Sequence, residues 1–349
     1  MHNSRRSFLK SLGLSSLAAC TGVTPVLAAH SVQHQIIKPS RLKIGDTVGL
    51  ISPAGIVYYS DQFTVVRESM EALGLKVKEG EHMRNRYGYL AGTDQERAAD
   101  VNAMFADPEV DAIVCVRGGW GCNRILPLLD YNMIRQNPKI LIGYSDITSL
   151  LNAIYARTGL ITFHGPLGRS IWNSFTLESI RSILFEGETI TLENPTIIGD
   201  NLTQVRDRVI TITPGKAKGR MLGGNLTVLS AMMGSQYLPE WKGSILFLED
   251  VDEDIYRIDR MLTQLKLSGV LDSLSGFVFG KCTGCGPGES YSSLTLEEVF
   301  NDHIKPLNIP AWHGSMIGHI NDMFTIPVGL PAEIDANKGS IKMLESGVI

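Results

Sequence analysis

The feature that most constrains the fold is an alternation of strand-like and helix-like runs between residues 42 and 165. The runs "DTVGLISPAG" (46–55), "DAIVCVRGG" (111–119) and "KILIG" (139–143) are apolar almost throughout. Strands of a parallel sheet that helices cover on both faces have this continuous apolar character. The sequence therefore predicts an α/β fold whose N-terminal domain is a parallel sheet of the flavodoxin or Rossmann type, with ligands at the carboxyl ends of its strands.

Two of the helix-like runs carry signals for where they begin. The run over residues 60–74 has helical spacing, and Ser60 or Asp61 is expected as its N-cap. The next run is expected to begin with a capping box, in which Thr93 is the N-cap and Glu96 bonds back to it.

The alternation is lost after about residue 170. The following stretch is polar with short β-like runs, and beyond it strands and helices resume in a mixed order that indicates a C-terminal α+β domain. We expect four parts: an export signal (1–29), an N-terminal α/β nucleophile domain (40–170), a linker (171–215) and a C-terminal domain (216–349).

The first 29 residues have the composition of an export signal. A basic start is followed by a modest apolar run and small residues, too short to span a bilayer. The pair Arg5 and Arg6, followed by Ser-Phe-Leu-Lys, is typical of the twin-arginine signal, which carries folded proteins into the periplasm. The structural alternative is an ordinary amphipathic helix. Maturation is expected either by cleavage near Ala28 or Ala29 or by lipidation at Cys20.

The amino-acid composition of the chain bears on which partners it can bind. The chain has 349 residues, 44% hydrophobic and 19% charged, with a formal net charge of −4, which is typical of a soluble globular protein. This balance does not favour nucleic acid or an anionic membrane surface, and no transmembrane span is expected in the mature chain.

Two of the five cysteines lie three residues apart. Cys282 and Cys285 could close a small disulfide in an oxidising compartment, or could form half of a metal site. No second cysteine or histidine pair at zinc spacing accompanies them. We interpret the pair as structural and predict that the protein uses no metal and no cofactor.

The stretch "PKILIGYSDITSLL" (138–151) places Ser145 at a turn between a strand-like and a helix-like run. A sharp turn of this kind exposes a nucleophilic hydroxyl and aims the following N–H, that of Asp146, at a developing oxyanion. The motif departs from G-x-S-x-G at Ile147. The alternative is that Ser145 is only a helix N-cap, with Asp146 in the first turn.

A glycine loop, "RGGWG" (117–121), follows the strand before it. The loop is not G-x-G-x-x-G and lacks the Lys-Ser/Thr of a phosphate loop, so a nucleotide cradle is disfavoured. Backbone N–H groups freed by glycine suit an oxyanion or a substrate carboxylate equally well. We interpret the loop as half of an oxyanion hole.

A serine nucleophile needs a base and an acid. Of the eight histidines, His164, His313 and His319 are the candidates for the base, although each taken singly is more often structural. Within an acidic run, Glu249 differs from its neighbours because it directly follows an apolar strand, at the end where sites form.

Five blocks together resemble the LD-carboxypeptidase family, relatives of the microcin-C immunity peptidases. They are "YLAGTDQERAADVNAMFADPEVDAIVCVRGGWGCNRILPLLD", "LIGYSDIT", "HGP", "ILFLEDVDEDIYRIDRML" and "GHINDMFTIPVG". The resemblance implies Ser145 as the nucleophile, His319 as the base and Glu249 as the acid. It also implies an oxyanion hole from the N–H groups of Asp146 and Gly119, and a site between two domains of a homodimer.

The resemblance further implies a serine carboxypeptidase that releases terminal D-Ala from peptidoglycan tetrapeptides. An exported member would meet the wall itself or shed muropeptides. Two rivals stay open. One is a microcin-immunity-like amidase acting on peptidyl-nucleotide conjugates, and the other is a non-catalytic muropeptide-binding protein.

Overall fold

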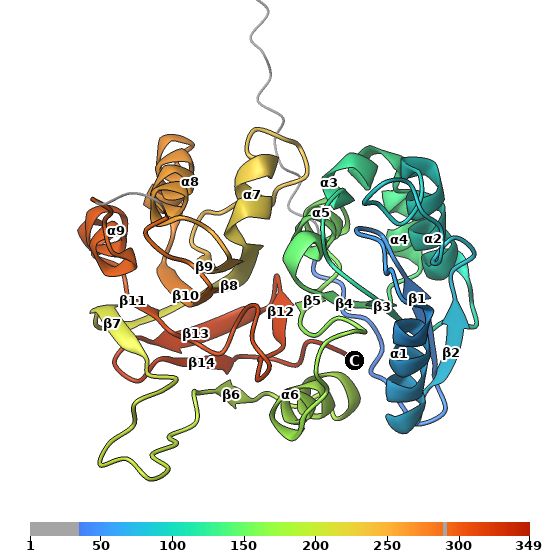
Figure 1. The fold of residues 1–349 in the computed structure, drawn as a ribbon, viewed down its shortest axis with the longest axis horizontal. Helices are drawn as coiled ribbons and strands as arrows, with labels where there is room; N and C mark the ends of the chain where they lie inside the picture. The colour runs from blue at the N-terminus through green and yellow to red at the C-terminus, as the bar shows by residue number, and fades with distance from the viewer. Residues whose placement is uncertain (1–34, 289–291) are drawn as a thin grey trace, which may run out of the picture. The chain divides into compact units, whose positions relative to one another are not determined.

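A six-stranded sheet forms the first half of the computed structural model, which describes residues 35–288 and 292–349. Its strand order is β12-β5-β4-β3-β1-β2 (Figure 1). All neighbours are parallel except β12, which runs antiparallel to β5. The strands are β1 (Thr47–Ile51), β2 (Lys76–Glu79), β3 (Ala112–Cys115), β4 (Ile140–Gly143), β5 (Thr162–His164) and β12 (Ile326–Val328).

Helices connect these strands in the expected order. They are α1 (Ser60–Ala72), α2 (Asp94–Ala106), α3 (Cys122–Ile125), α4 (Tyr131–Gln136) and α5 (Thr148–Thr158), with 3₁₀ turns η1 (Leu126–Leu128) and η2 (Ser145–Ile147). Strands β3 and β4 are buried along their whole length, as expected for central strands of a covered parallel sheet.

Of the two predicted helix starts, one is confirmed and the other is wrong. Helix α2 begins with the capping box of Thr93 and Glu96. Helix α1 has Tyr59 at its N-cap position and no side-chain cap, so the expectation of Ser60 or Asp61 is wrong. Both residues are already helical, and the carboxylate of Asp61 in the first turn instead complements the helix dipole.

A second, mixed sheet of eight strands has the order β6-β14-β13-β8-β9-β10-β11-β7. Its central strands β8 to β11 are parallel, and the outer pairs are antiparallel. The strands are β6 (Thr191–Leu192), β7 (Ile210–Thr213), β8 (Lys216–Asn225), β9 (Ile245–Val251), β10 (Gly276–Thr283), β11 (Ala311–His313), β13 (Pro331–Asp335) and β14 (Ser340–Met343).

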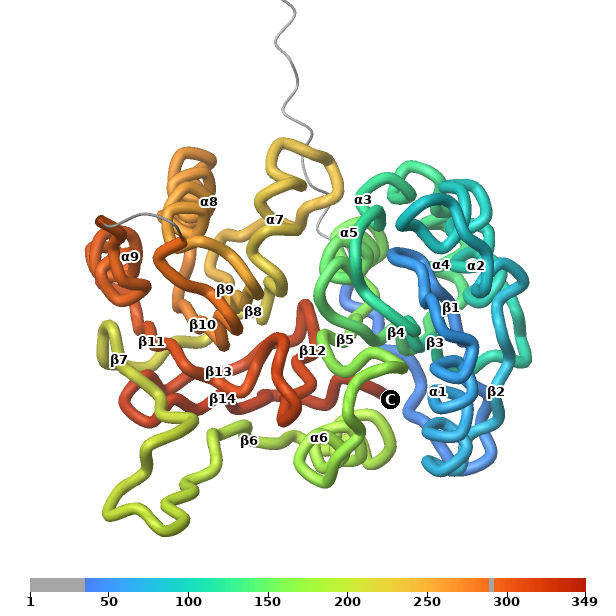
Figure 2. Tube along the Cα trace, viewed as in Figure 1, coloured from blue at the N-terminus to red at the C-terminus, as the bar shows by residue number. Residues whose placement is uncertain are grey.

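The helices of this half gather mostly on one side of its sheet, where α7, α8 and α9 lie next to one another (Figure 2). They and the remaining helical turns are α6 (Ser174–Ile180), η3 (Arg181–Phe185), α7 (Leu226–Met232), α8 (Ile255–Leu267), η4 (Leu271–Ser273), α9 (Leu296–His303) and η5 (Lys305–Leu307). A parallel sheet followed by a mixed α+β part confirms the predicted fold class.

The segment expected as a linker, residues 171–215, carries regular structure. It contains α6, the π-helical turn η3, and the edge strands β6 and β7 of the second sheet. In the other direction, β12 comes from the C-terminal part of the chain and completes the first sheet. The chain therefore returns to the first sheet to add β12 before it completes the second sheet with β13 and β14.

Two sequence-based expectations concern membranes and export. Among residues 35–288 and 292–349, no helix is long and apolar enough to cross a bilayer. The twin-arginine segment, Cys20 and the expected cleavage positions lie outside the described residues.

Candidate active site

Ser145 occupies a strained turn at the carboxyl end of β4. Its φ is 63°, in the left-handed region that non-glycine residues adopt rarely and at a cost. The turn is tight, since a Cβ added at Gly143 would come within 3.0 Å of the Ile147 side chain. This is the sharp strand-to-helix turn that the sequence predicted.

The alternative role of Ser145 as a helix cap is wrong. The N-cap positions of η2 and α5 are Tyr144 and Ile147, and neither helix start receives a side-chain cap. The Ser145 hydroxyl instead contacts His319.

A hydrogen-bonded line joins three of the predicted site residues. Nε2 of His319 lies 3.0 Å from Oγ of Ser145, and Nδ1 of His319 lies 2.7 Å from Oε2 of Glu249. With its proton on Nδ1, the imidazole donates to the carboxylate and accepts from the serine hydroxyl. Residues 174 positions apart in the sequence thus meet in one chemical unit.

The second sheet holds the acid and the base in place. Glu249 lies in β9 opposite Asn225 of β8 and is fully buried. Gly318 has a φ of 121°, and a Cβ there would come within 2.8 Å of Oε2 of Glu249. Only glycine therefore allows the loop before His319 to approach the carboxylate this closely.

Glu249 sets the protonation of His319. Burial lowers the pKa of His319, but the hydrogen bond to Glu249 and the charge of that carboxylate outweigh burial, so the pKa stands above its ordinary value of 6.5. The other carboxylate oxygen of Glu249, Oε1, is buried with no hydrogen-bond partner among the described residues. The negative charge of Glu249 is thus directed at the imidazole.

The glycine loop lies directly against the nucleophile. A Cβ added at Gly118 would come within 2.9 Å of Cβ and 3.0 Å of Oγ of Ser145, so this position requires glycine. Gly119 has a φ of 125°, and its N–H bonds to no acceptor among the described residues. The geometry suits a loop that offers backbone donors beside the serine hydroxyl.

Asp146 fastens the glycine loop to the nucleophile turn. Its buried carboxylate accepts a hydrogen bond of 2.8 Å from the N–H of Cys122, just after the loop. Burial raises the pKa of the Asp146 carboxyl. The guanidinium of the buried Arg97 also holds the loop, because it donates a hydrogen bond of 3.0 Å to the carbonyl of Gly121. The sequence predicted only the backbone N–H of Asp146, because a contact of its side chain to a distant loop leaves no local signal.

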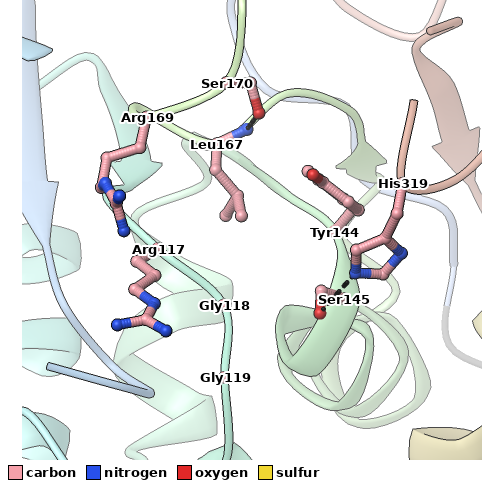
Figure 3. A pocket seen from close by; sticks show the side chains of 9 residues that line it. All are labelled: Arg117, Gly118, Gly119, Tyr144, Ser145, Leu167, Arg169, Ser170 and His319. Atoms are coloured by element: carbon pink, nitrogen blue, oxygen red, sulfur yellow. Dashed lines mark hydrogen bonds between the residues drawn. The ribbon is translucent and has the colours of Figure 1, made fainter. Parts of the chain in front are cut away.

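A pocket of about 330 Å³ opens in front of the serine (Figure 3). The residues that line it are Arg117, Gly118, Gly119, Tyr144, Ser145, Leu167, Arg169, Ser170 and His319. The ring of Tyr144 packs edge-on against the imidazole of His319, with 4.8 Å between ring centroids. Neither the side chain of Arg117 nor that of Arg169 was predicted from the sequence as part of the site.

The other two candidate histidines have different surroundings. His164, at the end of β5, is fully buried against Tyr144 and Phe247, and neither ring nitrogen has a partner among the described residues. Burial lowers its pKa to about 4, so it is neutral at pH 7. His313, in β11, packs on Phe300 and does not line the pocket.

The acidic run beyond Glu249 is not simply solvated. Asp250 is buried and accepts hydrogen bonds from Asn225 and from the N–H and hydroxyl of Thr227, at the start of α7. The pKa of Asp250 is raised to about 6, mainly by burial and secondly by the charge of Glu249. Its role is to fix α7 beside the end of β9.

A disulfide joins Cys282, near the end of β10, to Cys285, just beyond the strand. Between them, the hydroxyl of Thr283 donates to the backbone carbonyl of His319 at 2.9 Å. The two sulfurs are thus bonded to each other, and the described residues contain no group of three or more His, Cys, Asp or Glu side chains that could hold a metal ion.

The site contains a serine, a histidine and a buried carboxylate joined in series by hydrogen bonds, and a glycine loop lies beside the serine. This arrangement is typical of the serine hydrolases. Comparisons with known proteins narrow the class. Residues 48–165 match the family model described as the LD-carboxypeptidase N-terminal domain, and residues 218–334 match the LD-carboxypeptidase C-terminal domain. The chain belongs to the LD-carboxypeptidase family, and it is a hydrolase.

Three similar proteins illustrate this membership. The "Probable murein peptide carboxypeptidase" of Bacillus subtilis is 39% identical over 317 residues, which cover 89% of this chain and 95% of that protein. The microcin C7 self-immunity protein MccF, known from Escherichia coli, has a solved structure with a TM-score of 0.80 and 31% identity, covering 90% of this chain and 100% of its own. A muramoyltetrapeptide carboxypeptidase from Oxalobacter formigenes superposes with a TM-score of 0.71 at 26% identity, covering 85% of this chain and 97% of that one.

Proposed function

We propose that the protein is a serine carboxypeptidase that releases the terminal D-Ala from peptidoglycan tetrapeptides. The observation that carries the proposal is the hydrogen-bonded line from Ser145 through His319 to Glu249 at the floor of the pocket. The scissile bond joins the L-centre of the third residue to D-Ala. The names of relatives as murein peptide and murein tetrapeptide carboxypeptidases support this substrate class.

The reaction begins with attack by the serine. Nε2 of His319 takes the hydroxyl proton while Oγ of Ser145 forms a bond to the scissile carbonyl carbon. The carbonyl electron pair moves onto its oxygen, where the N–H groups of Asp146 and Gly119 stabilise the oxyanion. When the oxyanion collapses, the carbon–nitrogen bond breaks and His319 returns the proton to the nitrogen of the departing D-Ala.

Hydrolysis of the acyl-enzyme repeats these steps with water as the nucleophile. His319 takes a proton from water, the hydroxide oxygen bonds to the acyl carbon, and the proton returns to Oγ of Ser145 as the ester bond breaks. Glu249 moves no proton. Its carboxylate holds Nδ1 of the imidazole and stabilises the imidazolium that forms in each half of the reaction.

One rival activity keeps the same mechanism. The structural likeness to MccF, with a TM-score of 0.80, favours as second candidate an amidase that acts on peptidyl-nucleotide conjugates. A non-catalytic muropeptide-binding protein is disfavoured because such a protein needs no base aligned on a serine hydroxyl.

We propose further that the protein works in the periplasm as a homodimer, after export by the twin-arginine route. The pair Arg5 and Arg6 supports the route, and the disulfide between Cys282 and Cys285 suits an oxidising compartment. Replacing both arginines with lysine should leave the precursor in the cytoplasm, and unchanged periplasmic yield would contradict export. Light scattering of the mature protein tests the dimer.

Product analysis on a defined tetrapeptide tests the proposed function. The purified protein is incubated with L-Ala-γ-D-Glu-meso-diaminopimelate-D-Ala and, separately, with an aminoacyl sulfamoyl nucleoside. We expect stoichiometric D-Ala and tripeptide from the first and slower cleavage of the second. Efficient cleavage of the nucleoside alone would favour the MccF-like activity, and cleavage of neither would contradict both.

A further inference from the structure

Two arginines line the active-site pocket opposite the nucleophile. Figure 3 shows the guanidinium groups of Arg117 and Arg169 on one side of the pocket, with Ser145 and His319 on the other. No Asp or Glu side chain is among the residues that line the pocket. The pocket therefore presents positive charge to whatever enters it, and its own walls supply no carboxylate to balance that charge.

The backbone brings the two arginines together. Arg117 follows β3, and the loop after β5 runs beside it, because the N–H groups of Gly168 and Arg169 donate to the carbonyls of Cys115 and Val116 at 2.9 and 3.1 Å. A Cβ at Gly168 would come within 2.7 Å of the Val66 side chain, so the loop needs glycine to lie this close. The pairing of the two cations is thus built into the fold.

The electrostatics of the pair are unfavourable without an anion. Burial and the neighbouring charge of Arg117 both lower the pKa of Arg169. The guanidinium of Arg169 has no hydrogen bond or ion pair with any described residue. Arg117 donates one N–H to the carbonyl of Ile56, which is neutral, so this bond fixes its direction and cancels none of its charge. Arginine side chains placed in this way suit bidentate recognition of a carboxylate.

The chemistry of a carboxypeptidase substrate matches this position. In the terminal residue, only the nitrogen and the α-carbon separate the free carboxylate from the scissile carbonyl carbon. A group that anchors this carboxylate must therefore line the same pocket as the nucleophile, as both arginines do.

We propose that Arg117 and Arg169 bind the free α-carboxylate of the terminal residue, and so restrict the enzyme to bonds at chain ends. This inference rests on the proposed function and adds residues that determine its specificity. The arginines do not take part in bond making. They position the leaving residue and offset the desolvation of its carboxylate when the peptide enters the pocket.

The test compares two tetrapeptides that differ only at the C-terminus, one with a free carboxylate and one with an amide. Wild-type protein should prefer the free acid in kcat/KM on the order of 10- to 100-fold, the range expected for charge-assisted hydrogen bonds. Arg169→Gln should lose most of this preference because it slows cleavage of the acid far more than cleavage of the amide. Arg157→Gln, which removes an exposed arginine of α5 outside the pocket, is the matched control and should keep the preference.

Binding to the Ser145→Ala protein gives a second measurement that does not need turnover. The free acid should bind more tightly than the amide, and addition of Arg169→Gln or Arg117→Gln should remove the difference. Arg117→Gln also loses the bond to Ile56, so its affinity is scored per folded molecule, whereas Arg169 has no such structural contact.

Three outcomes would overturn the assignment. The first is an acid preference that persists in Arg169→Gln. The second is equal weakening of acid and amide, which would place another carboxylate of the peptide on the arginines. The third is failure of the Ser145→Ala protein to bind either peptide. A wild-type protein that binds the acid selectively but releases no D-Ala would contradict the proposed function and leave the arginine assignment standing.

Discussion

The two sheets contribute to the active site in different ways. The first sheet presents Ser145 through a strained backbone, with φ at 63°, and through a glycine loop that packs against the hydroxyl. Glu249 lies in β9 of the second sheet, and His319 lies in the loop that leaves β11 of that sheet. Burial and hydrogen bonds hold this pair, and the residue with positive φ beside His319 is a glycine, Gly318. Strain thus fixes the nucleophile, whereas polar contacts fix the base and its partner.

The nucleophile turn and the pair of Glu249 and His319 should therefore tolerate different substitutions. A strained turn costs stability in the folded protein, so removing the strain can stabilise the chain while destroying the site. A buried carboxylate has the opposite character, because removing its partner leaves an uncompensated charge. Substitutions on the two sides should therefore affect rate and stability in different proportions.

The largest expected effect is the loss of Ser145 or His319. Each change to alanine should lower kcat on the order of 10⁴- to 10⁶-fold, as for catalytic groups that act as one unit. The double variant should be little worse than either single one, since the second residue has no role once the first is gone. D-Ala release per folded molecule, measured beside a melting curve, checks both statements. A double variant whose losses multiply would show that the two side chains act independently.

Glu249→Gln should cost less, about 10²- to 10⁴-fold, because the carboxylate orients and stabilises the base without moving protons. The pH profile is the sharper readout. The base must be neutral, and Glu249 holds the pKa of His319 above 6.5, so wild-type kcat/KM should fall as pH drops through a value above 6.5. In Glu249→Gln the two largest effects that raise the pKa of His319 are lost, and burial is opposed only by the charges of Asp250 and Asp252, so this acidic limb should move to lower pH. If the acidic limb of the pH profile did not move, Glu249 would not control the pKa of His319.

A smaller effect is expected at the disulfide loop. Thr283→Val removes the hydrogen bond to the carbonyl of His319 and should lower kcat/KM by about 2- to 10-fold, the equivalent of one ordinary hydrogen bond. Thr64→Val, on the exposed side of α1, is the control. Replacing Cys282 and Cys285 together by serine should act in the same direction, since the loop loses its closure. Equal kcat/KM values for Thr283→Val and Thr64→Val would show that the disulfide loop does not support His319.

The smallest expected effect concerns stability. In the middle of a helix or strand, a protein with glycine is less stable than one with alanine by roughly 0.5–1 kcal/mol. At Ser145 the order should reverse, with Ser145→Gly more stable than Ser145→Ala by about 1 kcal/mol, because glycine alone adopts a φ of 63° without strain. Ser69, within α1, is the control position and should show the usual order. Denaturant unfolding of the four variants decides the sign.

The sequence predicted those features of the site that have a local signature. The apolar runs identified β3 and β4, and the polar turn after β4 identified Ser145 as a nucleophile or a cap. Local pattern could not decide between these roles, because the deciding contact is with His319, far along the chain. The pairing of Glu249 with His319 followed from the family resemblance, since neither residue alone differs from a structural one.

Other features could not be predicted because they depend on tertiary contact. Arg169 reaches the pocket only because its loop bonds to the end of β3, and nothing in "HGPLGRS" indicates that register. The buried carboxylate of Asp146 fastens a loop more than twenty residues away. The strand order that brings β12 into the first sheet likewise has no signal in the short run that forms it.

Covalent labelling with a fluorophosphonate probe, followed by mass spectrometry of the digested protein, tests the central claim most directly. The probe reacts with a serine hydroxyl only where a base and an oxyanion hole activate it. We expect one adduct per chain on the peptide that contains Ser145, none in Ser145→Ala, and strongly slowed labelling in His319→Ala. Labelling of Ser145→Ala at the wild-type rate, or an adduct on another serine, would contradict the claim that Ser145 is the nucleophile.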